Sequence, residues 1–134
     1  MKAQAITENH LFQKAYAAGK SRRGKYVSVY ILRDLANRRF VNADPLHRPL
    51  NRLGITVGKK YGGAVERVRA KRLIREAWRL TEKEYADRMK YGLLVVITAR
   101  QAIKDASMPD VRRDLEAALA FLGVIPAGGE TARP

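Results

Sequence analysis

Apolar residues recur at the spacing of an α-helix in three parts of the chain and gather into short runs in three others. The helical pattern occupies residues 7–19, 64–89 and 107–123, and the runs occupy residues 26–32, 53–57 and 93–97. The element order is therefore αββαβα. This order predicts an α+β fold in which a sheet and its helices form a two-layer α/β sandwich.

Residues that commonly begin or end helices lie at the edges of two of these patterns. Thr7 is placed to cap the first helix, and Gly19 is placed to end it. Ser107 and Pro109 open the last helix, and Gly123 closes it. The first and last helices thus have both a start and a stop signal.

The run at residues 93–97 is apolar throughout, which is typical of a central strand covered on both faces. It follows the long helix, and that helix follows the strand at residues 53–57. A strand, a helix and a second strand in this order predict a crossover connection with the two strands parallel.

Two segments lack a clear pattern of apolar positions. Residues 20–25 are polar and basic, and we expect a turn there. Residues 33–49 contain two prolines and several Asn and Asp residues, so we expect a long connection, with a strand end at Phe40 and Val41.

The long helix carries a stripe of positive charge. Between Lys59 and Arg79, eight residues are cationic and two are acidic. An i, i+4 row runs through Arg67, Lys71, Arg75 and Arg79, with Arg72 beside it. The opposite side carries Ala70, Leu73, Ile74, Ala77 and Trp78. Like charges at this spacing cost a helix about 0.2 to 0.5 kcal/mol per pair, so the stripe favours a polyanionic partner.

The whole chain is basic, with a net charge of +14 over 134 residues and a pI near 10.5. A solvated charged face would need no partner, but the segregation of the two signs favours nucleic acid. A membrane surface would require a free apolar face opposite the charge, and this helix needs that face for the core. A DNA-binding helix is a further alternative, and preference for duplex DNA over structured RNA would reveal it. We expect no DNA partner.

The length is that of one domain, which we expect to occupy residues 1–125 and to bind RNA. Residues 126–134, rich in Gly, Ala and Pro, are expected to form a disordered tail. The chain has no cysteine, no apolar signal sequence and no apolar run that could span a bilayer. We therefore expect a cytoplasmic protein that binds no membrane.

The segment from Leu53 to Glu76 resembles the signature of the bacterial ribonuclease P protein subunit. In that family a strand leads through a Lys-Lys turn into a helix with Ala-Val, an Arg-Asn-Arg element, Lys-Arg and Arg-Glu. The same spacing holds Lys59-Lys60, Ala64-Val65, Arg67-Val68-Arg69, Lys71-Arg72 and Arg75-Glu76 here. Upstream, Phe12 and Tyr16 precede Gly19, as two aromatic residues precede a glycine in the family's first helix. The resemblance covers about residues 6–122.

The resemblance implies a fold like that of ribosomal protein S5 domain 2. It also implies that the chain binds the catalytic RNA of ribonuclease P and helps it to remove the 5′ leader from precursor tRNA. The RNA is expected to perform the cleavage with its own Mg²⁺, and the chain is expected to hold no catalytic residue, metal or other cofactor. A structural RNA-binding protein, such as a ribosomal component, is the alternative.

The family also implies two sets of site residues. Contact with the catalytic RNA is implied for Arg67, Arg69, Lys71, Arg72, Arg75 and Arg79. Contact with the leader of the precursor tRNA is implied for Phe12, Tyr16, Tyr26, Ser28, Tyr30, Lys59 and Lys60. Aromatic rings flanked by cations are a common means of holding single-stranded RNA.

Without the family resemblance, the residue pattern does not decide whether these aromatic residues contact the leader or pack in the core. Phe12 and Tyr16, four apart on a short helix, are also typical of core residues. Tyr26, Ser28 and Tyr30 share one face of their strand, and their neighbours are apolar, so the tyrosine face is expected to be the open one.

One residue differs from the family pattern, and the histidines do not have the arrangement of a nuclease that acts alone. Val68 occupies the place of the family's Asn, so we expect one polar RNA contact to be missing or replaced. The two histidines, His10 and His47, lie in unrelated segments with no paired carboxylate or nucleophile motif beside them. The sequence therefore offers no self-contained nuclease site and no metal-binding spacing.

Overall fold

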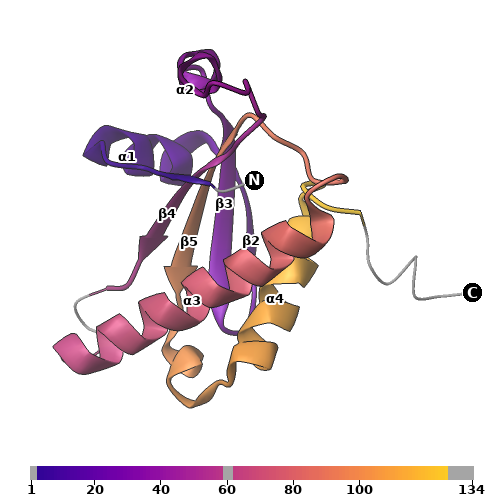
Figure 1. Cartoon of the computed structure of the whole chain (residues 1–134). Coiled ribbons are helices and arrows are strands. Elements are labelled where there is room, and N and C mark those ends of the chain that lie inside the picture. The colour runs from indigo at the N-terminus through magenta and orange to yellow at the C-terminus, as the bar shows by residue number, and fades with distance from the viewer. Residues whose placement is uncertain (1–2, 59–61, 127–134) are drawn as a thin grey trace, which may run out of the picture.

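Five strands in the described part of the chain form one mixed sheet (Figure 1). The computed structural model describes residues 3–58 and 62–126. The strands are β1 (Gln4–Ala5), β2 (Lys20–Arg23), β3 (Val27–Arg33), β4 (Arg52–Thr56) and β5 (Leu93–Ala99). Their order across the sheet is β1-β4-β5-β3-β2. β4 and β5 are parallel, which confirms the predicted crossover, and β3 runs antiparallel to β5.

The helices cover both faces of this sheet. They are α1 (Asn9–Ala18), α2 (Asn37–Ala43), α3 (Ala64–Tyr85) and α4 (Met108–Phe121), with a 3-10 helix, η2 (Gln101–Asp105). Figure 1 shows α3 and α4 side by side across one face, with α2 beyond one end of the strands. α1 packs on the other face, so the main two-layer arrangement of sheet and helices has a partial third layer.

The core has one large and one small part. On the face of α3 and α4, side chains of the central strands pack against the two helices. Val29 of β3 and Ile97 of β5 belong to the same cluster as Trp78 of α3 and Leu115 of α4. On the face of α1, Leu94 and Val96 pack with Ala15. All five residues of the run at 93–97 are buried, which confirms β5 as the covered central strand.

The structure corrects several expectations about the connections. Residues 20–25 do not form only a turn, because β2 lies there and pairs antiparallel with β3. All four β2 side chains are exposed, so this edge strand has no apolar alternation to detect. Phe40 and Val41 belong to α2, not to a strand end. The two-residue strand β1 also had no sequence signal.

The helix ends agree only in part with the sequence signals. Ser107 caps α4 as predicted. Its hydroxyl accepts a hydrogen bond from the backbone N–H of Asp110, and the carboxylate of Asp110 accepts one from the backbone N–H of Ser107. Gly123 follows α4 with φ of 82°, a left-handed conformation that favours glycine at a helix end. The predicted cap Thr7 is wrong, because Glu8 occupies that position. α3 ends at Tyr85, short of the predicted Met89.

The carboxylate of Asp114 on α4 fixes the turn between β2 and β3. It accepts hydrogen bonds from the backbone N–H groups of Lys25, Tyr26 and Val27, at 3.2, 2.8 and 3.0 Å. We expect Asp114→Ala to lower the free energy of unfolding by about 2 to 4 kcal/mol, because it leaves these donors without their charged acceptor. Urea unfolding would measure this loss, and Asp114→Asn, which keeps one carbonyl acceptor, should lose less. An unchanged stability in Asp114→Ala would contradict the assignment.

The predicted tail, residues 126–134, lies outside the described residues except for Pro126. The elements within residues 3–58 and 62–125 share one sheet and its two core clusters, and a single RNA-binding domain over residues 1–125 stays a prediction.

Candidate nucleic-acid interface

The outer face of α3 carries three cations that point away from the core. Lys71, Arg72 and Arg75 are exposed, and within residues 3–58 and 62–126 none of their side chains forms an ion pair or hydrogen bond. They lie opposite the buried residues Ile74, Ala77 and Trp78, which fix the helix against the sheet. The packed side of α3 thus holds the outer face in one orientation, with its charges available to an anion.

Val68 lies on this outer face, as the sequence predicted, and 48% of its surface is exposed. It is an apolar residue among cations, without a contact in the core clusters. The position therefore faces a partner or solvent, and its side chain offers no hydrogen bond.

Arg69 was predicted to contact RNA, but its guanidinium already has partners within the chain. It donates hydrogen bonds to the carbonyl oxygens of Ile103, Lys104 and Ala106 at 3.4, 3.2 and 3.0 Å. These carbonyls belong to η2 and the residue after it, so Arg69 fixes η2 to the first turns of α3. In this structure Arg69 therefore supports the fold, and its contact with RNA stays a prediction.

The remaining two predicted cations are partly engaged. Arg67 is half-buried, and its Nε is buried without a hydrogen-bond partner in the described part of the chain. Arg79 is exposed and donates two hydrogen bonds to Glu76, at 3.0 and 2.6 Å. The Arg79 hydrogen bond lowers the pKa of the Glu76 carboxyl, and the same contact raises the pKa of Arg79, so both stay charged at neutral pH.

Two of the predicted leader residues come together on the opposite face of the sheet. The rings of Tyr16 on α1 and Tyr30 on β3 meet edge to face, with centroids 4.9 Å apart. The Tyr16 hydroxyl lies 3.0 Å from the hydroxyl of Thr56 and 3.4 Å from that of Thr98. Thr56 and Thr98 lie 2.9 Å apart on the paired strands β4 and β5. We call Tyr16, Thr56 and Thr98 the hydroxyl cluster.

Phe12 has a packing role beside this cluster. A Cβ added to Gly54 on β4 would lie 2.4 Å from the Phe12 ring, so only a glycine at this position leaves room for the ring. Phe12 is half-buried against the small core, while Tyr16 remains 38% exposed. Of the two aromatic residues, Tyr16 is therefore the one that can meet a ligand.

The other predicted leader residues are not part of an open tyrosine face. Ser28 is buried, with 7% of its surface exposed. Tyr26 precedes β3, and its ring packs against the core on the side of α3 and α4, so it does not join Tyr30. This packing corrects the expectation that the two tyrosines share an open face. Lys59 and Lys60 lie outside the described residues.

A family model described as Ribonuclease P matches residues 1–123. The chain belongs to the ribonuclease P protein family. The ribonuclease P protein component of Clostridioides difficile (strain 630) is 33% identical over 115 residues, which cover 86% of this chain and 88% of that protein. The component of Symbiobacterium thermophilum is 32% identical over 128 residues, covering 96% and 98%. The structure of the Staphylococcus aureus RNase P protein matches with a TM-score of 0.67 at 28% identity, covering 92% and 99%.

The family assignment confirms both the resemblance and the fold class. The chain is the bacterial protein component of ribonuclease P, the endoribonuclease that matures the 5′ end of tRNA. Its α+β fold with a mixed sheet is that of the S. aureus RNase P protein.

Two residues of the hydroxyl cluster, Thr56 and Thr98, were not predicted from the sequence to be site residues of this ribonuclease P protein. Each lies near the end of a strand whose preceding residues are mostly apolar, which is a weak signal by itself. Their meeting depends on the parallel register that places Thr56 opposite Thr98. Ser28 also lies opposite Thr98, on β3. Only the pairing of three strands shows that these hydroxyl residues form one row.

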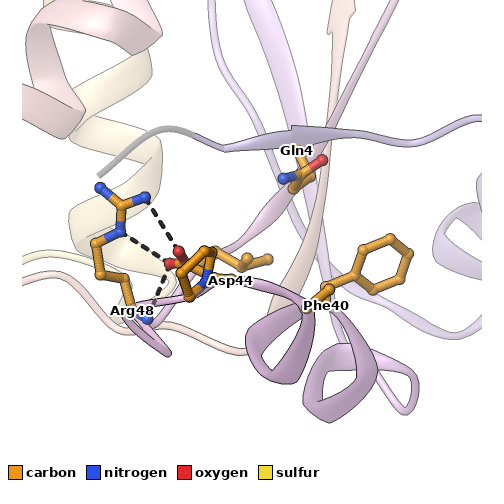
Figure 2. Close-up of a pocket in the computed structure, with 7 residues that line it drawn as sticks. Gln4, Phe40, Asp44 and Arg48 are labelled. Atoms are coloured by element: carbon orange, nitrogen blue, oxygen red, sulfur yellow. Dashed lines mark hydrogen bonds and ion pairs between the residues drawn. The ribbon is translucent and has the colours of Figure 1, made fainter.

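A hollow of about 460 Å³ lies beside α2, lined by Gln4, Phe40, Ala43, Asp44, Pro45, Arg48 and Leu50. Figure 2 shows the Arg48 guanidinium directed at Asp44, with Phe40 and Gln4 apart from that pair. The hydrogen bonds from Arg48 hold the pKa of the Asp44 carboxyl well below its usual range. Asp44 is thus ionised and already paired at neutral pH, so it cannot serve as an acid or base in this hollow.

The described residues of this ribonuclease P protein contain no group of three His, Asp or Glu side chains that could hold a metal ion. Nor do residues 3–58 and 62–126 contain a helix both long and apolar enough to cross a membrane.

Proposed function

We propose that this chain binds the catalytic RNA of ribonuclease P through the outer face of α3 and the 5′ leader of precursor tRNA beside the hydroxyl cluster. Binding both RNAs promotes endonucleolytic removal of the leader. The catalytic RNA performs the cleavage, with Mg²⁺ held by RNA rather than by the protein. The complex acts in the cytoplasm, where we expect precursor tRNA to be processed.

The observation that carries this proposal is the set of unpaired cations on a helix that is fixed on its other side. Lys71 and Arg75 are separated by one helical turn, and Arg72 lies beside both. Such like charges repel one another, and bound phosphates would relieve that repulsion. No described acidic side chain supplies that relief for these three residues.

The leader is assigned to the other face because of its chemistry. A single strand offers unstacked bases, which stack on exposed aromatic rings, and ribose hydroxyls, which accept and donate hydrogen bonds. Tyr16 supplies an exposed ring, and Thr56 and Thr98 supply hydroxyl groups beside it. The sheet separates this surface from the outer face of α3, so the two RNAs can be bound at the same time.

Reconstitution tests the function directly. The purified chain should stimulate cleavage of precursor tRNA by the ribonuclease P RNA at low Mg²⁺, because its cations supplement the charge neutralisation that Mg²⁺ otherwise provides. Failure to stimulate, with a folded protein and an RNA that is active at high Mg²⁺, would overturn the proposal. Family membership favours this role over that of a ribosomal component.

Tyr16→Ala should weaken binding of precursor tRNA to the reconstituted enzyme about tenfold, because stacking of one base on an aromatic ring contributes about 1 to 3 kcal/mol. Affinity for mature tRNA, which has no leader, should not change. Equilibrium binding of both tRNAs to the same enzyme would measure the difference. Phe12→Leu is the matched control, since Phe12 packs against Gly54 and should affect stability more than leader binding. Equal loss for both tRNAs would contradict a leader contact at Tyr16.

A further inference from the structure

Two hollows meet at the end of the sheet farthest from the hydroxyl cluster. The first, of about 970 Å³, lies between the end of β3, α2 and the turn before β5. The second, of about 270 Å³, lies between the start of β2, the end of β3 and Leu122, the residue after α4. Both are lined by Arg33, Lys90 and Leu93. The shared residues make the two hollows one continuous surface, which we call the basic groove.

The basic groove carries four exposed cations: Lys20, Arg33, Arg38 and Lys90. In the part of the chain that the structure describes, none of their side chains forms an ion pair or hydrogen bond. The acidic residue that lines the groove is Asp34, and its carboxylate is buried and bound by Arg52 at 2.8 and 2.9 Å. The charge of the groove is therefore uncompensated, as it is on the outer face of α3.

Apolar side chains lie among these cations, including Ile31, Leu93 and Leu122. A surface that mixes unpaired cations with apolar contacts matches the phosphates and sugars of an RNA backbone. A hollow with no acid available for proton transfer and no group of metal ligands offers little to a small-molecule substrate.

The strand register shows which face of the sheet the groove shares. Lys20 lies opposite Ile31, and Arg33 follows two residues later, so both are on the Ile31 side of β2 and β3. Ile31 packs in the core with α3 and α4. The hydroxyl cluster lies on the other face, near Ser28, about 16 Å along β3 from Arg33 at the rise of an extended strand. Ala18 and Leu32, from the side of α1, also line the second hollow, so the groove lies at the end of the sheet. An RNA seated on α3 reaches Lys20 and Arg33 from their own face of the sheet.

We propose that the basic groove binds backbone phosphates of the ribonuclease P catalytic RNA, as a second contact in addition to the outer face of α3. This inference rests on the proposed function, because it assigns a further surface to the same RNA. The protein then contacts that RNA along the middle of α3 and again beyond its C-terminal end, where Lys90 follows the last residue of the helix, Tyr85, by five positions.

The test compares two variants that each lose two positive charges. Arg33→Gln/Lys90→Gln removes cations from the groove, and Lys14→Gln/Arg113→Gln removes exposed cations from the outer sides of α1 and α4. Affinity for the catalytic RNA alone, without precursor tRNA, is measured between about 0.05 and 0.2 M monovalent salt, over which phosphate contacts change affinity by orders of magnitude. Thermal unfolding of each variant shows that the fold is intact.

The groove variant should bind the catalytic RNA about 25- to 60-fold more weakly than the native chain at 0.1 M salt, with a log–log salt slope smaller by about 1.4 to 1.8. The control should lose much less affinity. Equal losses in both variants would overturn the proposal, because they would reflect net charge alone. Unchanged RNA affinity with weaker binding of precursor tRNA would also overturn it, by placing the substrate in the groove. If the native chain itself fails to bind the catalytic RNA, the proposed function fails instead.

A second measurement reports position rather than affinity. The chain has no cysteine, so Asn42→Cys places a single thiol on α2 at the groove, to which an iron–EDTA probe can be attached. In the complex this probe should cleave the catalytic RNA at nucleotides that differ from those cut by a probe on Val68→Cys. Absence of RNA cleavage from Asn42→Cys, with cleavage from Val68→Cys, would contradict RNA contact at the groove.

Discussion

Replacement of Lys71, Arg72 and Arg75 together by glutamine should weaken binding of the catalytic RNA by about 100- to 500-fold at 0.1 M salt. Each phosphate contact contributes about 0.7 to 0.9 to the slope of log affinity against log salt, so three contacts contribute about 2.1 to 2.7. The affinity of the variant should therefore fall less steeply with salt than that of the native chain, by this difference in slope.

The fold should tolerate this change. The three side chains are exposed and form no ion pair or hydrogen bond within the described residues, and glutamine has nearly the helix propensity of Lys and Arg. Removal of the like charges at Lys71 and Arg75 also relieves a repulsion of about 0.2 to 0.5 kcal/mol. The melting temperature should therefore remain the same or rise slightly, which separates loss of binding from loss of structure.

Arg69→Gln provides the matched comparison on the same helix. Arg69 donates to three carbonyls at η2, so its replacement should lower stability and leave the salt slope of RNA binding nearly unchanged. Fluorescence anisotropy with labelled RNA at several salt concentrations would measure all three proteins. A triple variant with the salt slope of the native chain would contradict the assignment of α3 as an RNA-binding face.

The comparison of Arg69 with Lys71 shows what a helical pattern can and cannot predict. Spacing placed both residues on the charged side of α3, because an i, i+4 pattern depends only on the helix itself. It could not show that η2, more than thirty residues later, presents three carbonyl oxygens beside Arg69. The role of a surface cation thus depends on a tertiary neighbour that its own helix does not specify.

The same limit applies to the leader surface and to the connections. The apolar run of β5 predicted a covered central strand, because burial on both faces excludes polar residues. β2 consists of exposed polar residues and is held by backbone pairing with β3, so its side chains carry no strand pattern. By strand alternation Tyr26 should share a face with Tyr30. Tyr26 lies before β3 begins, however, and its ring packs against the large core on the side of α3 and α4.

Arg52 was not singled out by the sequence, since a lone arginine at the start of a strand has the pattern of an exposed edge residue. In the structure its side chain is 2% exposed, and its guanidinium donates to both oxygens of Asp34, which is also 2% exposed. The Phe40 ring lies 4.4 Å from the guanidinium, and Glu8 lies 3.4 Å away. Hydrogen bonding to Asp34 raises the pKa of Arg52, so the residue remains charged.

Arg52→Met should lower the free energy of unfolding by about 3 to 5 kcal/mol, because it leaves the Asp34 carboxylate buried without a counter-charge. Asp34 also accepts a hydrogen bond from the Ala36 backbone, and an asparagine could keep that acceptor. The double variant Arg52→Met/Asp34→Asn removes both charges and should recover most of the loss, to within about 1 to 2 kcal/mol of the native chain. Urea unfolding at pH 7 would compare the four proteins of this cycle.

The two outcomes of that cycle have different physical meanings. Recovery in the double variant means that the cost of Arg52→Met comes from an uncompensated buried charge. The intact Arg52–Asp34 pair then contributes little net free energy to folding. A double variant as unstable as Arg52→Met would mean that the contacts of the arginine with Phe40 and Glu8 carry the stability. Hydrogen exchange would locate the effect: the amides of α2 should exchange faster in Arg52→Met, because Asp34 and Phe40 join this helix and its preceding turn to β4.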